Sequence, residues 1–225
     1  MIRLRASEGA CTSSSVGDKL SGLQDLHDRV NNLLILPLTQ QAIAQENNEK
    51  WVDELLDGSL LVLDLCNTAK DALLQTKECV HELQSILRGC GEIGLTSEVK
   101  KYLTSRKVLK KAICKALKGM QNKCTFSTYN GDHETTTVFC RLKKVEAISF
   151  DVFESLLTFV YGPKTRPTAL LSLVDHNTYK SDNIKGVQSQ LEKLESCIQD
   201  IEEGLECLFR NLIKTRVFLL NILSR

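Results

Sequence analysis

The chain has 225 residues, of which 25% are charged, 5% are aromatic and three are proline, and its formal net charge is +1. A net charge this close to zero points to no particular class of partner, and nucleic acid is not the partner that we favour. Abundant leucine with few aromatic residues and few prolines favours helices. A chain of this length buries roughly 70% of its unfolded surface, so its core needs no disulfides or metals.

Residues 1–17 are mostly small and polar, and we predict that they form a disordered leader before a single helical-bundle domain at 18–225. The first residues contain no apolar segment of the kind found in secretory signals. The nine cysteines are odd in number and show no paired framework. We therefore expect free thiols, a reducing compartment and a cytoplasmic location, with peripheral membrane attachment as an alternative.

The first half of the chain contains two long amphipathic segments separated by a short one. A helix is predicted from about Asp18 to Leu36, where Pro37 ends it. Thr39 is a candidate cap for a short helix that runs through Gln45. The next helix is predicted from about residue 47 to residue 88, and its apolar line consists of Val52, Leu55, Val62, Cys66, Ala69, Leu73, Val80, Leu83 and Leu87.

The middle of the chain is predicted to hold two more helices. The sequence GCGEIGLTS at 89–97 contains three glycines and predicts a turn, after which Ser97 caps a helix to about Asn122. A loop follows at 123–131, and Asp132 caps a helix to about Tyr161. The segment 162–183 is polar and contains two prolines, with TALLSLV at 168–174 as a short helix.

The last helix, at about 183–223, has the most regular pattern in the chain. Its apolar positions recur at alternating steps of three and four residues, with one full heptad from Leu212 to Leu219, which is the a/d pattern of a coiled coil: Ile184, Val187, Leu191, Leu194, Ile198, Ile201, Leu205, Leu208, Leu212, Leu219 and Ile222. This predicts a strut that packs along its whole length. We expect an all-α, elongated helical bundle whose spine is formed by two long helices, one of them the coiled-coil-like C-terminal helix.

No catalytic or metal-binding constellation is recognisable. The acids of EEGLEC at 202–207 (Glu202, Glu203 and Glu206) are interpreted as solvated surface charges. The four histidines are scattered, and neither CxxC nor HExxH occurs. GCGEIG follows a helix and lacks the GK[ST] ending of a phosphate loop. The prediction is therefore no catalytic, cofactor-binding or metal-binding residues and no cofactor.

One segment has an unusual charge. Residues 99–123 contain nine basic residues and no acid. On a helical wheel five lysines fall within about 80° of one another, opposite an apolar arc; they are Lys100, Lys107, Lys111, Lys115 and Lys118. This is a candidate face for an anionic partner: an acidic protein, a membrane surface or nucleic acid. The alternative is a core helix whose lysines are solvated or face the acidic half of the last helix.

Four segments together resemble one known plant family. They are LSGLQDLHDRVNNLLILPLTQQAIAQ, KWVDELLDGSLLVLDLCNTAKDALLQTKECVHELQSILR, EVKKYLTSRKVLKKAICKAL and IEEGLECLFRNLIKTR. The family is called domain of unknown function 241 and is also described as BYPASS-like. This chain departs from its pattern at Asn211, where arginine is expected, and after TALLSLV, where a further helical stretch is expected.

The resemblance implies no enzyme activity and no catalytic residues. It implies a non-enzymatic interaction or regulatory protein of plant root and shoot development, because relatives are linked to control of a root-derived mobile signal. The alternative is a peripheral membrane-surface protein that acts through the basic helix at 99–123. The expected partners are an unidentified protein, an anionic membrane surface as the alternative, and a second copy of the chain.

Overall fold

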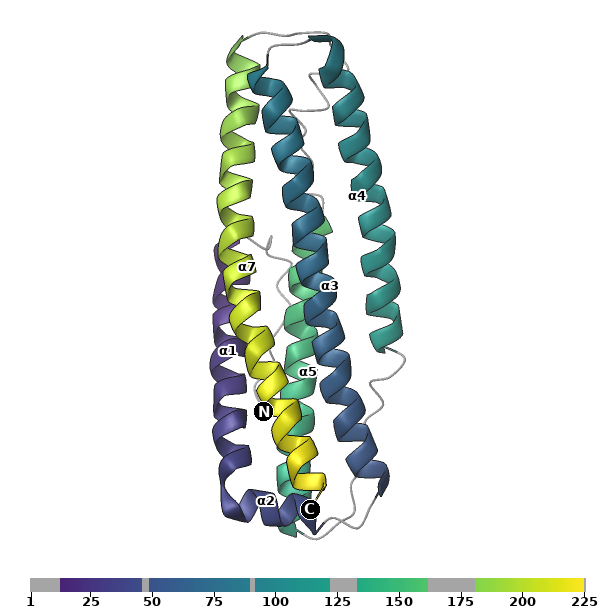
Figure 1. Cartoon of the computed structure of the whole chain (residues 1–225), viewed down its shortest axis with the longest axis vertical. Coiled ribbons are helices and arrows are strands. Elements are labelled where there is room, and N and C mark those ends of the chain that lie inside the picture. The colour runs from purple at the N-terminus through teal and green to yellow at the C-terminus, as the bar shows by residue number, and fades with distance from the viewer. Residues whose placement is uncertain (1–12, 46–48, 90–91, 122–132, 162–180, 225) are drawn as a thin grey trace, which may run out of the picture.

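A computed structural model describes residues 13–45, 49–89, 92–121, 133–161 and 181–224. All regular structure in these residues is helical, as the sequence predicts (Figure 1). The helices are α1 (Ser13–Ile35), α2 (Pro37–Ala44), α3 (Glu49–Arg88), α4 (Glu92–Gln121), α5 (His133–Tyr161) and α7 (Ser181–Leu223). The helices α3 and α7, of 40 and 43 residues, run the length of an elongated bundle and form the predicted spine.

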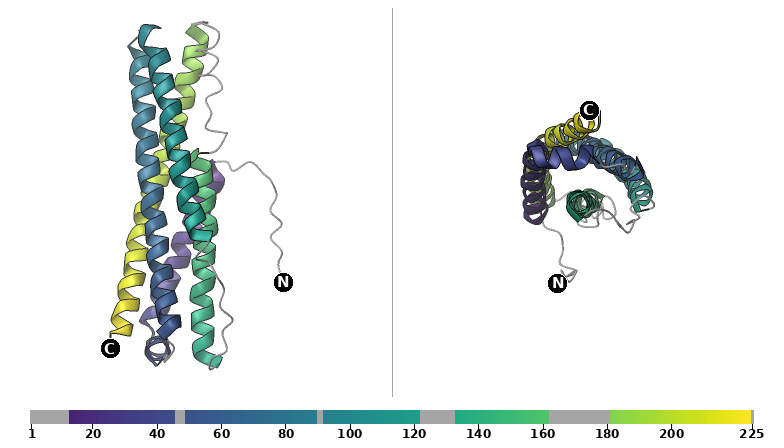
Figure 2. Two further views of the ribbon diagram at one scale, coloured as in Figure 1. Left: turned by 90° about the vertical axis from the view of Figure 1, so that its right-hand side faces the viewer. Right: turned by 90° about the horizontal axis from the view of Figure 1, so that it is seen from below.

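The helices are arranged in an arc around α5. Viewed along the bundle, α1, α7, α3 and α4 follow one another, and α5 lies on the concave side (Figure 2). The helices α1 and α5 accompany only one half of the spine, and α2 crosses the end of the bundle (Figure 1). Among the described residues, α4 packs against α3 and α5 and makes no contact with α7.

Long-range hydrogen bonds fix the direction and register of the helix pairs. Gln24 and Asn31 of α1 both donate to backbone oxygens of α7 that lie 180 residues further along the chain, so these two helices are parallel. Between α3 and α7, Lys70 pairs with Glu206, whereas Lys77 pairs with the earlier Glu202, so this pair is antiparallel.

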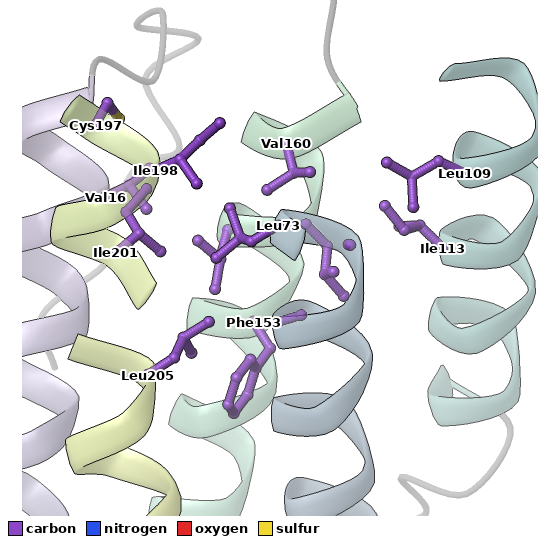
Figure 3. Close-up of a cluster of buried hydrophobic side chains, with 14 of the residues drawn as sticks. Val16, Leu73, Leu109, Ile113, Phe153, Val160, Cys197, Ile198, Ile201 and Leu205 are labelled. Atoms are coloured by element: carbon purple, nitrogen blue, oxygen red, sulfur yellow. The ribbon is translucent and has the colours of Figure 1, made fainter. Parts of the chain in front are cut away.

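Most of the core is a single apolar cluster along α7. Figure 3 shows part of it, with Leu73, Phe153, Ile198 and Leu205 from α3, α5 and α7 around a common centre. The predicted seam of α7 is buried: Leu205 and Leu208 are 0% exposed. Most of the other a/d positions are at most 4% exposed, namely Val187, Leu191, Ile198, Ile201, Leu212, Leu219 and Ile222. The burial of this seam is confirmed, and its coiled-coil character stays a prediction.

A second, smaller cluster closes the end of the bundle where α2 lies. Trp51 and Phe139 pack there with ring centroids 5.7 Å apart and planes tilted by 52°. Leu219 and Ile222 contribute from the end of α7, and Ile43 of α2 is 0% exposed. The short helix α2 therefore serves as an apolar cap against the ends of α1, α5 and α7.

Two predicted boundaries in the N-terminal region are wrong. The first helix begins at Ser13, inside the predicted leader, because Val16 is buried and extends the apolar line of α1 by one turn. The short helix begins at Pro37, whose fixed φ suits the first position of a helix. Thr39 is buried inside α2 and does not cap it. Residues 1–12 lie outside the described part of the chain.

The predicted turn at 89–97 is also mostly wrong. The helix α4 begins at Glu92, so the segment EIGLTS is helical and Ser97 lies inside the helix. A glycine within a helix lowers helix stability by about 1 kcal/mol relative to alanine. The tertiary context of a long helix can outweigh a penalty of this size. The predicted short helix TALLSLV and the shortened connection after it lie mainly at 162–180, outside the described residues.

The six described cysteines are free thiols, as predicted. Cys66 and Cys197 are buried like small apolar residues, whereas Cys207 is exposed. Within the described ranges, no helix combines the length and the apolar composition needed to cross a bilayer.

The buried seam predicts a strong contrast between two leucines of α7. Leu205→Asp places an unpaired charge among 0%-exposed neighbours, so we expect a loss of at least about 4 kcal/mol of unfolding free energy in urea titrations followed by circular dichroism. Leu220→Asp is the matched control, because Leu220 is 43% exposed. It should change stability by about 0.5 kcal/mol or less. Equal losses in both variants would contradict the burial of the seam.

Candidate functional site

The five lysines predicted as an anionic-partner face lie together on the outside of α4. Each of their side chains is exposed, and we call this set the α4 lysine face: Lys100, Lys107, Lys111, Lys115 and Lys118. At 1.5 Å per residue the face is about 27 Å long. Among the described residues none of the five side chains is in an ion pair, so their positive charges are available to a partner.

Packing on the opposite side of α4 fixes the direction of this face. Tyr102, Leu109 and Ile113 are buried against the bundle. Arg106 reaches α5, where its guanidinium donates to the backbone oxygen of Val160 at 2.5 Å. Because these anchors occupy the inner side of the helix, the lysines point away from the core. The predicted division of α4 into an apolar arc and a lysine arc is thus what the structure shows.

The alternative in which the lysines face the acids of the last helix is wrong. The acids of α7 pair instead with α3: Lys70 Nζ lies 2.6 Å from Glu206 Oε2, and Lys77 Nζ lies 2.6 Å from Glu202 Oε2. One or two turns further on, His81 Nε2 lies 2.7 Å from Glu195. These pairs form a ladder along the α3–α7 seam.

Glu202 and Glu206 remain surface charges, with side chains 26% and 43% exposed, and the ladder gives each of them a lysine partner. The hydrogen bond from Lys70 and its positive charge lower the pKa of Glu206. The Lys70 ammonium also lies 4.6 Å from the centre of the Phe209 ring. An open hollow of about 550 Å³ at this seam is lined by the charged residues Lys70, Glu202, Glu206 and Arg210, with Asp71, Leu74 and Glu203. Since its main charges already pair with one another, we do not consider it a catalytic site.

A buried polar cluster around His27 is the other chemically distinct site. His27 is 4% exposed, and its Nε2 lies 2.9 Å from the hydroxyl of Ser149. That hydroxyl donates its single hydrogen to the backbone oxygen of Val145 at 2.8 Å. It follows that Nε2 of His27 carries the proton and donates to Ser149, which leaves Nδ1 unprotonated. Nδ1 is buried and has no hydrogen-bond partner among the described residues.

The protonated form of His27 is strongly disfavoured. Burial lowers its pKa to about 4, against an ordinary value of 6.5, although Asp28 acts in the opposite direction. A cavity of about 40 Å³ adjoins the ring and is lined also by Gly58, Glu146 and Thr215. Small-molecule sites typically measure roughly 300–1,000 Å³, so this cavity cannot accept an organic substrate.

Glu146 explains a glycine in the middle of α3. A Cβ at Gly58 would lie within 2.6 Å of both oxygens of the Glu146 carboxylate, so any larger residue would require the carboxylate to move from this position. Lys143 holds the carboxylate at 2.9 Å and donates to the backbone oxygen of Glu54 at 3.0 Å. Burial nevertheless raises the pKa of Glu146. The arrangement fastens α5 to α3, and we interpret it as structural.

No group of three or more histidine, cysteine, aspartate or glutamate side chains in the described ranges is arranged to hold a metal ion. Cys79 instead donates to the Ser105 hydroxyl at 3.5 Å, and His81 is engaged by Glu195. The absence of a metal, a cofactor and catalytic residues remains a prediction.

Comparison with known proteins gives one match. The family model described as Protein BPS1 matches residues 19–222, nearly the whole chain. The chain belongs to the BPS1 family. This confirms the BYPASS-like resemblance of the sequence. No curated protein and no solved structure matches the chain.

The backbone of Asn211, where the BPS1-family resemblance leads us to expect arginine, has a structural role in this chain. Asn211 is 5% exposed, and its backbone oxygen accepts hydrogen bonds from Asn31 at 3.2 Å and from Thr215 at 3.0 Å. The Thr215 hydroxyl also lies 2.7 Å from Oδ1 of Asn31. The family gives no catalytic residues to carry over, so this cluster is best explained as a polar connection between α1 and α7.

His27 predicts a pH-dependent stability. Between pH 6.5 and about 4 the unfolded chain takes up a proton that the folded chain excludes, so stability falls as pH falls through this window and levels off below it. At 1.36 kcal/mol per pH unit, the loss attributable to His27 is about 3 kcal/mol. Urea titrations at several pH values would measure it.

His27→Gln isolates this effect, because glutamine keeps an N–H donor for Ser149 but does not titrate. The difference in stability between wild type and this variant should shrink by about 3 kcal/mol between pH 7 and pH 4. Glu146 titrates in both proteins, and its contribution cancels in the difference. A difference that does not change with pH would contradict the buried, uncharged state of His27.

Proposed function

We propose that this protein is a non-enzymatic interaction or regulatory protein of plant root and shoot development that binds an acidic partner protein through the α4 lysine face. Membership of the BPS1 family supports the developmental role. The exposure of all five lysines on an anchored helix supports the binding surface, and it is the observation that carries the proposal. A cytoplasmic location belongs to the proposal, because the cysteine pattern predicts free thiols.

The α4 lysine face has the features of a recognition surface for anions. Its lysines are held in one line by a helix that is anchored on its other side, so binding does not require the helix to be ordered first. Complementary charge mainly accelerates and directs association, which suits a regulatory contact. A row of ammonium groups on an exposed helix face attracts anions without positioning a substrate for reaction, which favours binding over catalysis.

Affinity capture from plant tissue tests this proposal. The full chain should capture a set of proteins that is lost when the five lysines of the face are changed to glutamate. The matched control changes five exposed cations outside α4 to glutamate, which gives the same net charge: Arg29, Lys144, Lys185, Lys193 and Lys214. The control should retain the captured proteins. Loss with both variants, or with neither, would contradict a role for this face.

A peripheral membrane-surface function is the second candidate, and the same exposed lysines favour it. Each lysine near an anionic bilayer contributes about 1 kcal/mol. The apolar side of α4 is buried in the bundle, so adsorption would be electrostatic and would not involve insertion.

Co-sedimentation with phosphatidylserine vesicles separates the two candidates. If the membrane function holds, the chain binds at low salt and is released as the Debye length falls from about 10 Å at 0.1 M to about 3 Å at 1 M. The five-lysine variant should then stay in the supernatant, while the matched control sediments. No binding of the wild-type chain at low salt would exclude the membrane candidate and leave the protein partner.

A further inference from the structure

The helix next to α4 carries a face of the opposite charge. Six acids of α3 fall within about 60° of one another at 100° per residue, and all six are exposed. We call them the α3 acidic face: Asp53, Asp57, Asp64, Asp71, Glu78 and Glu82. Like the α4 lysine face, they make no ion pair among the described residues, in contrast to the paired charges of the α3–α7 seam. Two unpaired faces of opposite sign therefore lie on neighbouring helices.

The contacts between α3 and α4 determine which residues of the two faces lie at the same height. Gln75 Nε2 donates to the Ser105 hydroxyl at 3.2 Å, and the Cys79 thiol donates to it at 3.5 Å. Ser105 of α4 is thus level with the middle of the 75–79 turn of α3. Both helices rise by about 1.5 Å per residue, and they run in opposite directions, so the register extends along the pair.

Counting from this point, three lysines are level with three acids. Lys111 lies six residues beyond Ser105, and Asp71 lies six residues before the centre of the 75–79 turn. The corresponding offsets are five residues in the other direction for Lys100 and Glu82, and 13 residues for Lys118 and Asp64. The level pairs are Lys100 with Glu82, Lys111 with Asp71, and Lys118 with Asp64. Lys107 lies between the levels of Asp71 and Glu78. The two faces therefore match in spacing as well as in sign.

We propose that the α4 lysine face binds the α3 acidic face of a second copy of this chain, in a symmetric dimer. A two-fold axis parallel to the bundle places α4 of each copy over α3 of the other and keeps every residue at its own height. The level lysines and acids then meet twice, once in each direction, as a self-complementary interface requires. Val108, which is 57% exposed between the lysine face and α3, would be covered in such a dimer.

A second copy fits these helices better than an anionic bilayer does. A membrane that approached α4 would also approach the acids on the adjoining helix, and these would be repelled. A second copy provides a positive face for the acids and a negative face for the lysines at the same time. This inference rests on the proposed role of the α4 lysine face as a binding surface, and it names one partner for it.

Sedimentation velocity of the purified full chain at low and high salt tests the dimer. At about 50 mM salt we expect concentration-dependent dimerisation, and at about 500 mM the dissociation constant should rise at least roughly tenfold because the charges are screened. Two reversed variants are compared with wild type. The first changes the five lysines of the face to glutamate; the second changes Asp64, Asp71, Glu78 and Glu82 to lysine. Each alone should be monomeric.

A mixture of the two reversed variants gives the sharpest result. The lysine-to-glutamate variant presents acids on both α3 and α4. The acid-to-lysine variant presents lysines at the matching levels of both helices. Neither variant should self-associate, but together they should form a heterodimer. The matched control, with five cations outside α4 changed to glutamate, should dimerise like wild type at low salt. Circular dichroism checks that each variant is folded, and glutamine and asparagine replacements at the same positions provide a second, milder pair that should also weaken the dimer.

The inference is overturned by a wild-type chain that stays monomeric at low salt, by a dimer that survives both reversals, or by a mixture that does not associate. A monomer that binds phosphatidylserine vesicles through the five lysines would favour the membrane instead. Failure of the dimer and failure of the proposed function are separate outcomes. If the purified chain is monomeric, capture of a protein from plant tissue can still depend on the α4 lysine face.

Discussion

Burial of one continuous face of α7 is the constraint on which the rest of the bundle depends. This helix packs against α1 on one side, where it runs parallel, and against α3 on the other, where it runs antiparallel. At Gly204 the two backbones come close enough for Gln24 of α1 to donate to a carbonyl oxygen of α7 at 2.7 Å. A Cβ at this glycine would lie 2.6 Å from a methyl group of Leu20, so the approach depends on its absence. The other helices are added to this layer.

The charges of the molecule fall into two classes with different physical roles. At the α3–α7 seam, acids and bases pair within the chain and help to set the register of the spine. The α4 lysine face and the α3 acidic face make no ion pair among the described residues, although the two helices are neighbours. Surface ion pairs contribute little to stability, typically up to about 1 kcal/mol each. The charges of these two faces are therefore better explained as a binding surface for a partner than as a contribution to the stability of the fold.

Much of this architecture could be predicted because it is encoded by local periodicity. The alternating steps from Val187 to Ile222 predict the buried side of α7, and a helical wheel predicts that Lys111 and Ile113 face in opposite directions. Helix starts were harder to predict, because burial of Val16 and continuation of the helix through 92–97 outweigh local signals for caps and turns. The pairing of His27 with Ser149, 122 residues away, has no sequence signal, since each residue alone is ordinary. The partners of Glu202 and Glu206 could not be predicted either, because they depend on the register between distant helices.

The position of α4 at the end of the arc has a consequence for its motion. In the described structure α4 packs on α3 along its length and reaches α5 over only part of it, whereas α7 packs extensively against both α1 and α3. Cooperative units with the fewest buried contacts open first in native-state hydrogen exchange. The amides of α4 should therefore exchange by detachment of this helix as a unit, while those of α7 exchange only on global unfolding. A partner that bound α4 together with α3 would slow that detachment. Binding would then slow hydrogen exchange of the backbone amides along the whole of α4, including amides far from any lysine that the partner contacts.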